Sequence, residues 1–69
     1  MNYYEVMFED GFAIAIKGKR EPTIEEAQKF CHYEYANVIE FLSLEEEEMR
    51  EYFDCSNIDN WPIFGEEEN

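Results

Sequence analysis

The chain has 69 residues, of which 18 are acidic and 5 basic, and its formal net charge is −13. This length allows one domain with a small core, and no apolar run is long enough to span a bilayer. A surface with this charge repels nucleic acid and anionic membranes and attracts basic partners. The composition therefore argues against direct nucleic-acid or membrane binding, and we expect a cytoplasmic protein.

The negative charge is confined to the later part of the chain. Residues 1–20 contain three acidic and three basic residues, whereas residues 21–69 contain fifteen acidic and two basic ones. The whole net charge therefore falls on the elements that residues 21–69 form.

The first seventeen residues predict a β-hairpin around the triplet Glu9-Asp10-Gly11. A three-residue loop gives one uninterrupted apolar face, whereas a two-residue loop would mix apolar and polar side chains on both faces. We expect Gly11 to adopt the left-handed conformation in a bulge after a type I turn. The predicted cross-strand pairs are Phe8 with Phe12, Val6 with Ile14 and Tyr4 with Ile16.

A helix is predicted to begin after Thr23. Thr23 and Glu26 have the spacing of a capping box, in which each side chain accepts a hydrogen bond from the other residue's amide. An amphipathic pattern follows, with an apolar stripe formed by Ile24, Ala27, Phe30 and Cys31. We expect this helix to lie on the sheet and to end at about Tyr33 or Tyr35.

Residues 38–42 allow two interpretations. Their β-branched and aromatic content favours a third strand that pairs with the hairpin. Helical spacing of apolar residues would also allow one continuous helix through residue 53. We favour the strand, because Ser43 and Glu46 repeat the capping-box spacing and a new cap implies a new helix.

The second helix is predicted from Leu44 to about Phe53. Its first turn would carry four consecutive glutamates, where the helix dipole favours negative charge. The side chains expected to face inward are Leu44, Met49, Tyr52 and Phe53.

The end of the chain predicts an extended clip. Pro62 excludes the apolar segment 61–64 from a helix interior or a central strand. We expect this segment to pack over the sheet edge, or over the small side chains of Ala13 and Ala15, which leave room for Trp61. The domain would then comprise residues 1–64, followed by a disordered acidic tail at 65–69.

Catalysis and metal binding are poorly supported by the sequence. His32 follows Cys31 directly, but adjacent helical positions point in different directions and do not form a nucleophile and base pair. Cys31, His32 and Cys55 lack the spacing of metal ligands, and the glutamate run lacks the alternation of a calcium loop. We expect two reduced thiols, no cofactor, no metal and no enzymatic activity.

The acidic helical surface has two readings. Its carboxylates either serve solubility alone or present spaced negative charge as a nucleic-acid backbone does, and so occupy a basic groove. Nearby aromatic residues such as Tyr33, Tyr35 and Tyr52 could add anchors. The predicted partner-binding residues are Glu25, Glu26, Glu45, Glu46, Glu47, Glu48, Glu51, Tyr52 and Asp54.

Four segments of the first 27 residues carry a resemblance to other proteins: Tyr3-Tyr4-Glu5-Val6, Asp10-Gly11, Ile16-Lys17-Gly18 and Pro22-Thr23-Ile24-Glu25-Glu26-Ala27. They look similar to short, mostly uncharacterised proteins carried by phages and other mobile elements of bacteria. The resemblance supports a strand-strand-helix start and implies no activity or site. Some small acidic proteins of that broad origin are anti-CRISPR or anti-restriction inhibitors, several of which act as DNA mimics.

Together these patterns predict one α+β domain of order ββαβα. Two helices would cover one face of a three-stranded antiparallel sheet. The predicted function is that of a non-catalytic acidic protein that inhibits a basic, nucleic-acid-binding defence protein. The alternative is a small structural or homodimerisation module whose charge serves solubility.

Overall fold

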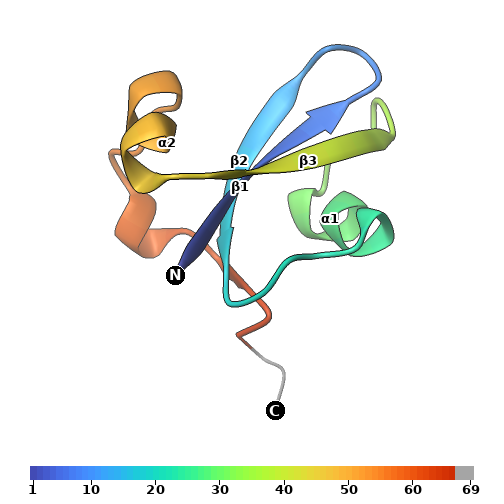
Figure 1. Ribbon diagram of the computed structural model, residues 1–69. Coiled ribbons are helices and arrows are strands. Elements are labelled where there is room, and N and C mark those ends of the chain that lie inside the picture. The colour runs from blue at the N-terminus through green and yellow to red at the C-terminus, as the bar shows by residue number, and fades with distance from the viewer. Residues whose placement is uncertain (67–69) are drawn as a thin grey trace.

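The computed structural model describes residues 1–66, which form a four-stranded mixed sheet, two α-helices and a short 3-10 helix. In chain order the elements are β1 (Asn2–Phe8), β2 (Ala13–Gly18), α1 (Ile24–Cys31), β3 (Val38–Leu44), α2 (Glu46–Tyr52), η1 (Ile58–Asn60) and β4 (Ile63–Phe64). The strands lie in the order β3-β1-β2-β4, and β4 is parallel to β2 (Figure 1). The α+β class is as predicted, whereas the predicted three-stranded antiparallel sheet lacked β4. Neither helix in this part of the chain has the length and hydropathy needed to cross a bilayer.

The hairpin of β1 and β2 has the predicted register. Val6 pairs with Ile14, and the amide of Phe8 donates to the carbonyl of Phe12 at 2.9 Å. Gly11 has a φ of 87°, and its amide donates to the carbonyl of Phe8 at 3.0 Å. A bulged three-residue loop needs a left-handed residue at this position, so the predicted loop length and the left-handed Gly11 are confirmed.

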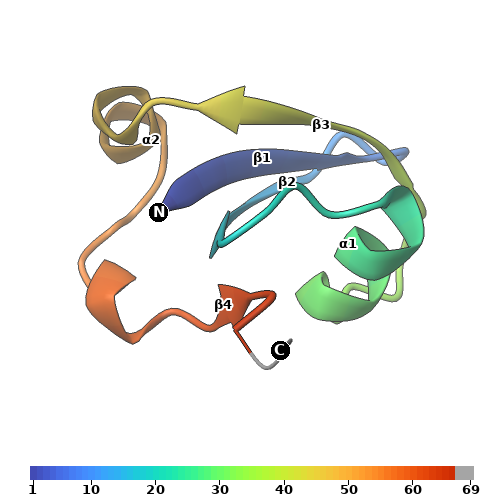
Figure 2. The same ribbon diagram turned by 60° about the horizontal axis from the view of Figure 1, so that its bottom comes forward.

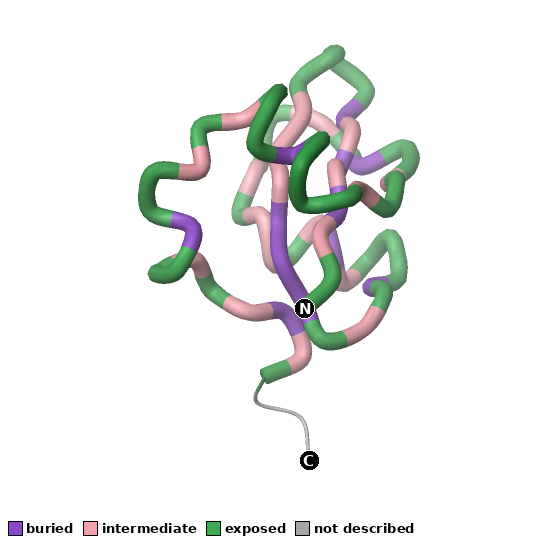
Figure 3. The backbone as a smooth tube through the Cα atoms, turned by 60° about the vertical axis from the view of Figure 1, so that its left-hand side comes forward, coloured by how far each residue is buried: buried purple, intermediate pink, exposed green. Residues whose placement is uncertain are grey.

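One face of the hairpin forms the core beneath α1. Its buried residues come from both strands of the hairpin, from α1 and from β3. Figure 3 shows buried stretches of the tube along the central strands and mostly exposed ones at the turns. Ile24, predicted to face the core, is half exposed at the first turn of α1. The buried cluster consists of Tyr4, Val6, Phe8, Ile16, Ala27 and Val38.

Helix α1 begins as predicted and ends earlier. Both hydrogen bonds of the capping box are present, from the Glu26 amide to Thr23 Oγ1 at 3.2 Å and from the Thr23 amide to Glu26 Oε1 at 3.0 Å. The helix stops at Cys31 because His32 adopts the left-handed conformation, with a φ of 53°. The predicted end at Tyr33 or Tyr35 is therefore wrong.

The side chain of Gln28 explains the early end of α1. Its Nε2 donates to the carbonyl of Tyr33 at 2.9 Å, and its Oε1 accepts from the amide of Val38 at 2.7 Å. These bonds satisfy backbone groups of the loop and bring the chain back to the sheet, so that further helical turns are excluded.

Residues 38–44 form the third strand, and the continuous helix through residue 53 is excluded. β3 pairs antiparallel with β1, where Glu40 lies opposite Met7 and Val38 lies opposite Phe8. Ile39 is therefore the extra residue of a bulge. The bulge changes the face to which the strand's side chains point, so that Val38 enters the core beside Phe8.

The predicted cap of the second helix is absent. Ser43 lies within β3 opposite Tyr4, and α2 begins at Glu46 after an N-cap residue, Glu45, whose side chain makes no capping hydrogen bond. Met49 is buried as predicted, whereas Tyr52 is 72% exposed and does not face inward. Because Ser43 pairs with Tyr4 in the sheet, it cannot cap a helix, and α2 is shorter than predicted, at Glu46–Tyr52.

The two helices contact opposite faces of the hairpin. The phenol of Tyr3 donates to Glu46 Oε1 at 3.1 Å, and Lys17 Nζ donates to the carbonyl of Ile58 at 2.5 Å. Tyr3 and Lys17 are paired and point away from the core face. The predicted arrangement of both helices on one face is therefore wrong, and Figure 2 shows α1 and α2 at opposite ends of the molecule.

The C-terminal clip lies at the sheet edge, as predicted, and extends the sheet as β4. The amide of Lys19 donates to the carbonyl of Phe64 at 2.9 Å, and the Phe64 ring meets that of Phe30 edge to face at 5.5 Å between centroids. The amide of Glu66 donates to the carbonyl of Ile63 at 3.2 Å. Residues 65 and 66 thus form a turn where a disordered tail was predicted, and residues 67–69 of that tail lie outside the described residues.

Candidate interaction surface

Helix α2 and its flanks carry a concentration of exposed carboxylates, which we call the acidic patch. One basic residue, Arg50, lies among them. A hollow of about 420 Å³ opens beside the start of the helix, between the chain's first three residues and residues 43–46. The acidic patch consists of Glu45, Glu46, Glu47, Glu48, Glu51 and Asp54.

The carboxylates of the acidic patch are not equivalent. Glu46 accepts from Tyr3 and lies 3.6 Å from an Arg50 nitrogen, so it is held against the fold. Positions three or four apart on a helix are neighbours, which places Glu47 and Glu48 beside Glu51. These three form the compact part of the patch that faces solvent.

Asp54 and Tyr52 complete the C-terminal side of the acidic patch. Asp54 Oδ1 accepts from the amide of Ser56 at 3.0 Å, and hydrogen bonds from Ser56 lower the pKa of this carboxyl. The carboxylate of Asp54 is therefore fixed in a turn and charged at neutral pH. Tyr52 adds an exposed ring to the same short helix.

Glu25 and Glu26 lie on α1, at the other end of the molecule (Figure 2). Glu26 pairs with Arg20 at 2.7 Å, and hydrogen bonds from Arg20 and from the Thr23 amide lower the pKa of its carboxyl to about 2. Its charge is thus neutralised locally. The structure brings seven of the nine predicted partner-binding residues together around α2, and these two do not join them.

A second exposed cluster lies at the opposite end of the sheet, and we call it the aromatic tip. It comprises the rings of Phe12, Tyr33 and Tyr35. Phe12 stacks on Tyr33 at 5.0 Å between centroids, with 14° between the ring planes, and Tyr35 meets Tyr33 edge to face at 5.4 Å. Tyr35 is 87% exposed and Phe12 50% exposed.

The sequence singled out Tyr33 and Tyr35 but missed Phe12 and Asp10. The predicted pairing of the third strand with the hairpin could have placed these two residues beside Tyr33 and Tyr35. If β3 runs antiparallel to β1, its first residue lies beside Phe8, and the loop before it must then meet the hairpin turn. The amide of Glu9 indeed donates to the carbonyl of Asn37 at 3.0 Å.

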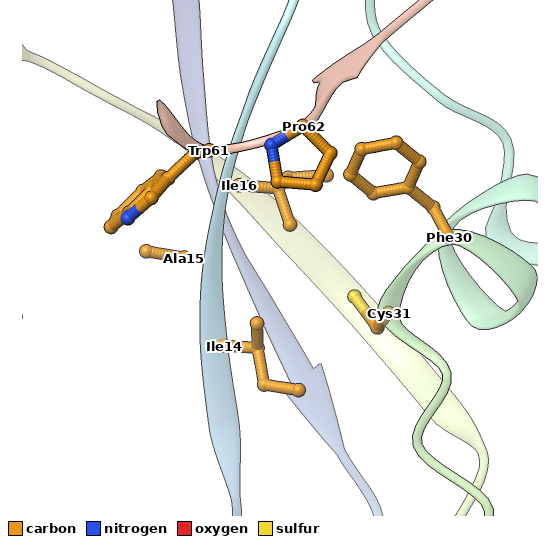
Figure 4. A pocket seen from close by; sticks show the side chains of 7 residues that line it. All are labelled: Ile14, Ala15, Ile16, Phe30, Cys31, Trp61 and Pro62. Carbon is orange, nitrogen blue, oxygen red and sulfur yellow. The ribbon is translucent and has the colours of Figure 1, made fainter. Parts of the chain in front are cut away.

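A third feature is an apolar hollow of about 250 Å³ at the edge of β2. In Figure 4, Trp61 and Ala15 lie to one side of the β2 ribbon, and Phe30 and Cys31 lie to the other. Burial raises the pKa of the Cys31 thiol to about 11, so the thiol stays protonated at neutral pH and is a poor nucleophile. Cys31 and Cys55 are both free thiols.

Residues 1–66 contain no group of three or more metal-ligating side chains. Comparison with protein-family models, with curated proteins and with solved structures found no match. Function is therefore inferred from the chemistry of the two exposed surfaces, the acidic patch and the aromatic tip.

Proposed function

We propose that this chain is a non-catalytic acidic protein that binds and inhibits a basic, nucleic-acid-binding protein of bacterial defence. The observation that carries the proposal is the acidic patch. Four of its six carboxylates lie on the seven-residue helix α2 and two flank it, and the helix contains one arginine. Glu47 and Glu51 are like charges four residues apart and repel each other, and a bound cation relieves this repulsion. A basic groove supplies that cation.

The dimensions of α2 set how much nucleic acid it could replace. A helix of seven residues is about 10 Å long, and one strand of B-DNA carries a charge about every 3.4 Å. The compact trio of Glu47, Glu48 and Glu51 corresponds to about three phosphates of one strand. The patch would thus block a short stretch of a groove rather than follow its length.

Tyr52 supports binding over simple solvation. Its ring is exposed among the carboxylates, and tyrosine is enriched among the residues that contribute most to the binding energy of protein interfaces. A surface that served solubility alone would not need a large ring at this position. We expect Tyr52 to be covered when the partner binds.

Capture from a bacterial lysate tests the proposal. Immobilised protein should retain basic nucleic-acid-binding proteins at about 0.1 M salt and release them at about 1 M, because the Debye length falls from about 10 Å to about 3 Å. Added duplex DNA should also release them, since it competes for the same groove. Retention that withstands both treatments would contradict the proposal.

The outer edge of β3 favours a second candidate function, homodimerisation. β3 is an edge strand of seven residues, and Ile39 and Leu42 on it are 53% and 48% exposed. Long apolar edges pair with other strands, and a second copy could pair there antiparallel about Phe41. Sedimentation of the chain and of Leu42→Lys tests this: a dimer that the substitution dissociates would support it, and a monomer in both would exclude it.

A further inference from the structure

The aromatic tip is held rigidly although it is exposed. Tyr33 donates to Asp10 Oδ2, and Asp10 Oδ1 accepts from the amide of Phe12 at 3.0 Å. The loop that carries Tyr33 and Tyr35 is fixed from below by Gln28, which donates to the carbonyls of Tyr33 and Ala36. The Tyr33 ring and the backbone of this loop therefore lose little freedom when a ligand covers them.

Only part of the aromatic tip serves the core. Tyr33 packs on buried Phe8, with 4.4 Å between the centroids, and so closes one end of the core. Tyr35 is 87% exposed, and among residues 1–66 its ring contacts that of Tyr33 and covers no core residue. The fold does not explain why a large ring is placed here.

The charge around the tip is negative. Exposed carboxylates of Glu9, Asp10 and Glu34 lie on its two loops, and one cation, Lys29, lines a hollow on its α1 side together with His32, Tyr33 and Glu34. The face of an aromatic ring attracts a cation through the ring quadrupole. Rings and carboxylates together favour a cationic ligand with a flat apolar surface, which describes a guanidinium better than an ammonium.

The same chain contains an internal precedent for this arrangement. The Arg20 guanidinium carbon lies 4.7 Å from the centroid of the Phe64 ring, while its nitrogens donate to both oxygens of Glu26 at 3.1 and 2.7 Å. The ring of Phe64 and the carboxylate of Glu26 both contact this guanidinium, which also donates to the carbonyl of Glu21 at 3.2 Å. The chain's second arginine, Arg50, lies beside Glu46 on α2, so the tip offers rings and carboxylates to an arginine from another molecule.

We propose that the aromatic tip binds an arginine side chain of a basic partner, with the guanidinium over the exposed ring of Tyr35 and beside the carboxylate of Glu34. This rests on the proposed function only in taking the partner to be basic. The tip and the acidic patch lie at opposite ends of β3, about 20 Å apart for seven residues of strand. The two sites would therefore contact different parts of one partner.

The test uses the full chain and short peptides, and needs no identified partner. A blocked peptide with two arginines is titrated into isotopically labelled protein, followed by the same peptide with lysine and with citrulline, the neutral isostere of arginine. We expect backbone amide shifts at residues 33–35 and 10–12 with the arginine peptide, weaker shifts with lysine and none with citrulline. Equal shifts with arginine and lysine would overturn the proposal.

Tyr35→Leu removes the ring at a position that the core does not use, and Tyr35→Phe is the matched control that keeps it. Tyr35→Leu should weaken arginine-peptide binding by roughly two- to fivefold, the range of one exposed cation–π contact, while Tyr35→Phe should bind as the wild type does. Unchanged binding by Tyr35→Leu would overturn the proposal. A variant with four acidic-patch glutamates replaced should still bind at the tip, which separates this inference from the proposed function.

Discussion

The phenol of Tyr33 donates a hydrogen bond to the carboxylate of Asp10, 23 residues earlier in the chain. This bond joins the loop after α1 to the hairpin turn. It lowers the pKa of the Asp10 carboxyl and raises the pKa of Tyr33 to about 12, since it stabilises the charged carboxylate and the neutral phenol. Two segments that are mobile in most small proteins are thereby held together, and the aromatic tip is built on them.

The hairpin turn depends on glycine at position 11. A Cβ added there would meet no atom within 4 Å, so the cost of Gly11→Ala comes from the backbone, whose φ is 87°. We expect a loss of about 1 kcal/mol in the free energy of unfolding, measured by urea denaturation. Gly11→Asn is the control, because asparagine tolerates the left-handed region. Equal losses in both variants would point to a cause other than this conformation.

The two capping-box patterns should respond differently to substitution. Thr23→Ala removes a side-chain bond to the Glu26 amide and should cost about 1 kcal/mol. Ser43→Ala should cost much less, because Ser43 is an exposed strand residue. Denaturant midpoints of the two variants check this. A Ser43→Ala loss as large as that of Thr23→Ala would contradict the strand assignment of residue 43.

Gly18 allows β4 to approach β2. An added Cβ would lie 3.0 Å from Phe64 Cβ and 3.2 Å from the Phe64 carbonyl oxygen. Gly18→Ala should therefore push β4 away and weaken the bond from the Lys19 amide to Phe64. We expect faster hydrogen exchange at the Lys19 amide with little change at amides of the β1–β3 pair. Unchanged protection of Lys19 would show that β4 does not need this close approach.

Stability should fall with acid between pH about 5 and 2 partly through Glu26. The pKa of this carboxyl is about 2 when folded, against an ordinary value of 4.5. A lowered folded pKa gives stability that is present above 4.5 and is lost as pH falls through about 2. Glu26→Gln should flatten this part of the pH profile of the unfolding midpoint. Glu25→Gln, which changes the net charge equally and keeps the Arg20–Glu26 pair, is the matched control. Matching profiles for Glu26→Gln and wild type would refute the role of the Arg20 pair.

Local chemistry made the first half of the fold predictable. The hairpin register follows from one apolar face and one glycine, and the start of α1 follows from Thr23 and Glu26. These signals act over a few residues and meet no competing interaction. The end of α1 has no such signal, because the residue that turns there is His32 rather than glycine.

Long-range pairing decided the rest of the fold. Ser43 has the same capping spacing as Thr23, but pairing with Tyr4 places it in a strand. The parallel contact of β4 with β2 requires the chain to pass α2 and η1 first, and a two-residue strand leaves no pattern in sequence. Strand β3 likewise places α1 and α2 at opposite ends of the molecule (Figure 2), and this separates Glu25 and Glu26 from the acidic patch.

The proposed function requires that the acidic patch, rather than total charge, recognises the basic partner. The most direct measurement is the affinity of the captured basic protein for two variants of equal net charge, at about 0.1 M and 1 M salt. One replaces Glu45, Glu47, Glu48 and Glu51 by glutamine and keeps the hydrogen bond from Tyr3 to Glu46. The other replaces Glu21, Glu25, Glu40 and Glu66, which are exposed outside the patch and the tip. We predict strong loss of binding at low salt for the first variant alone, and equal affinities for the two variants would contradict the account.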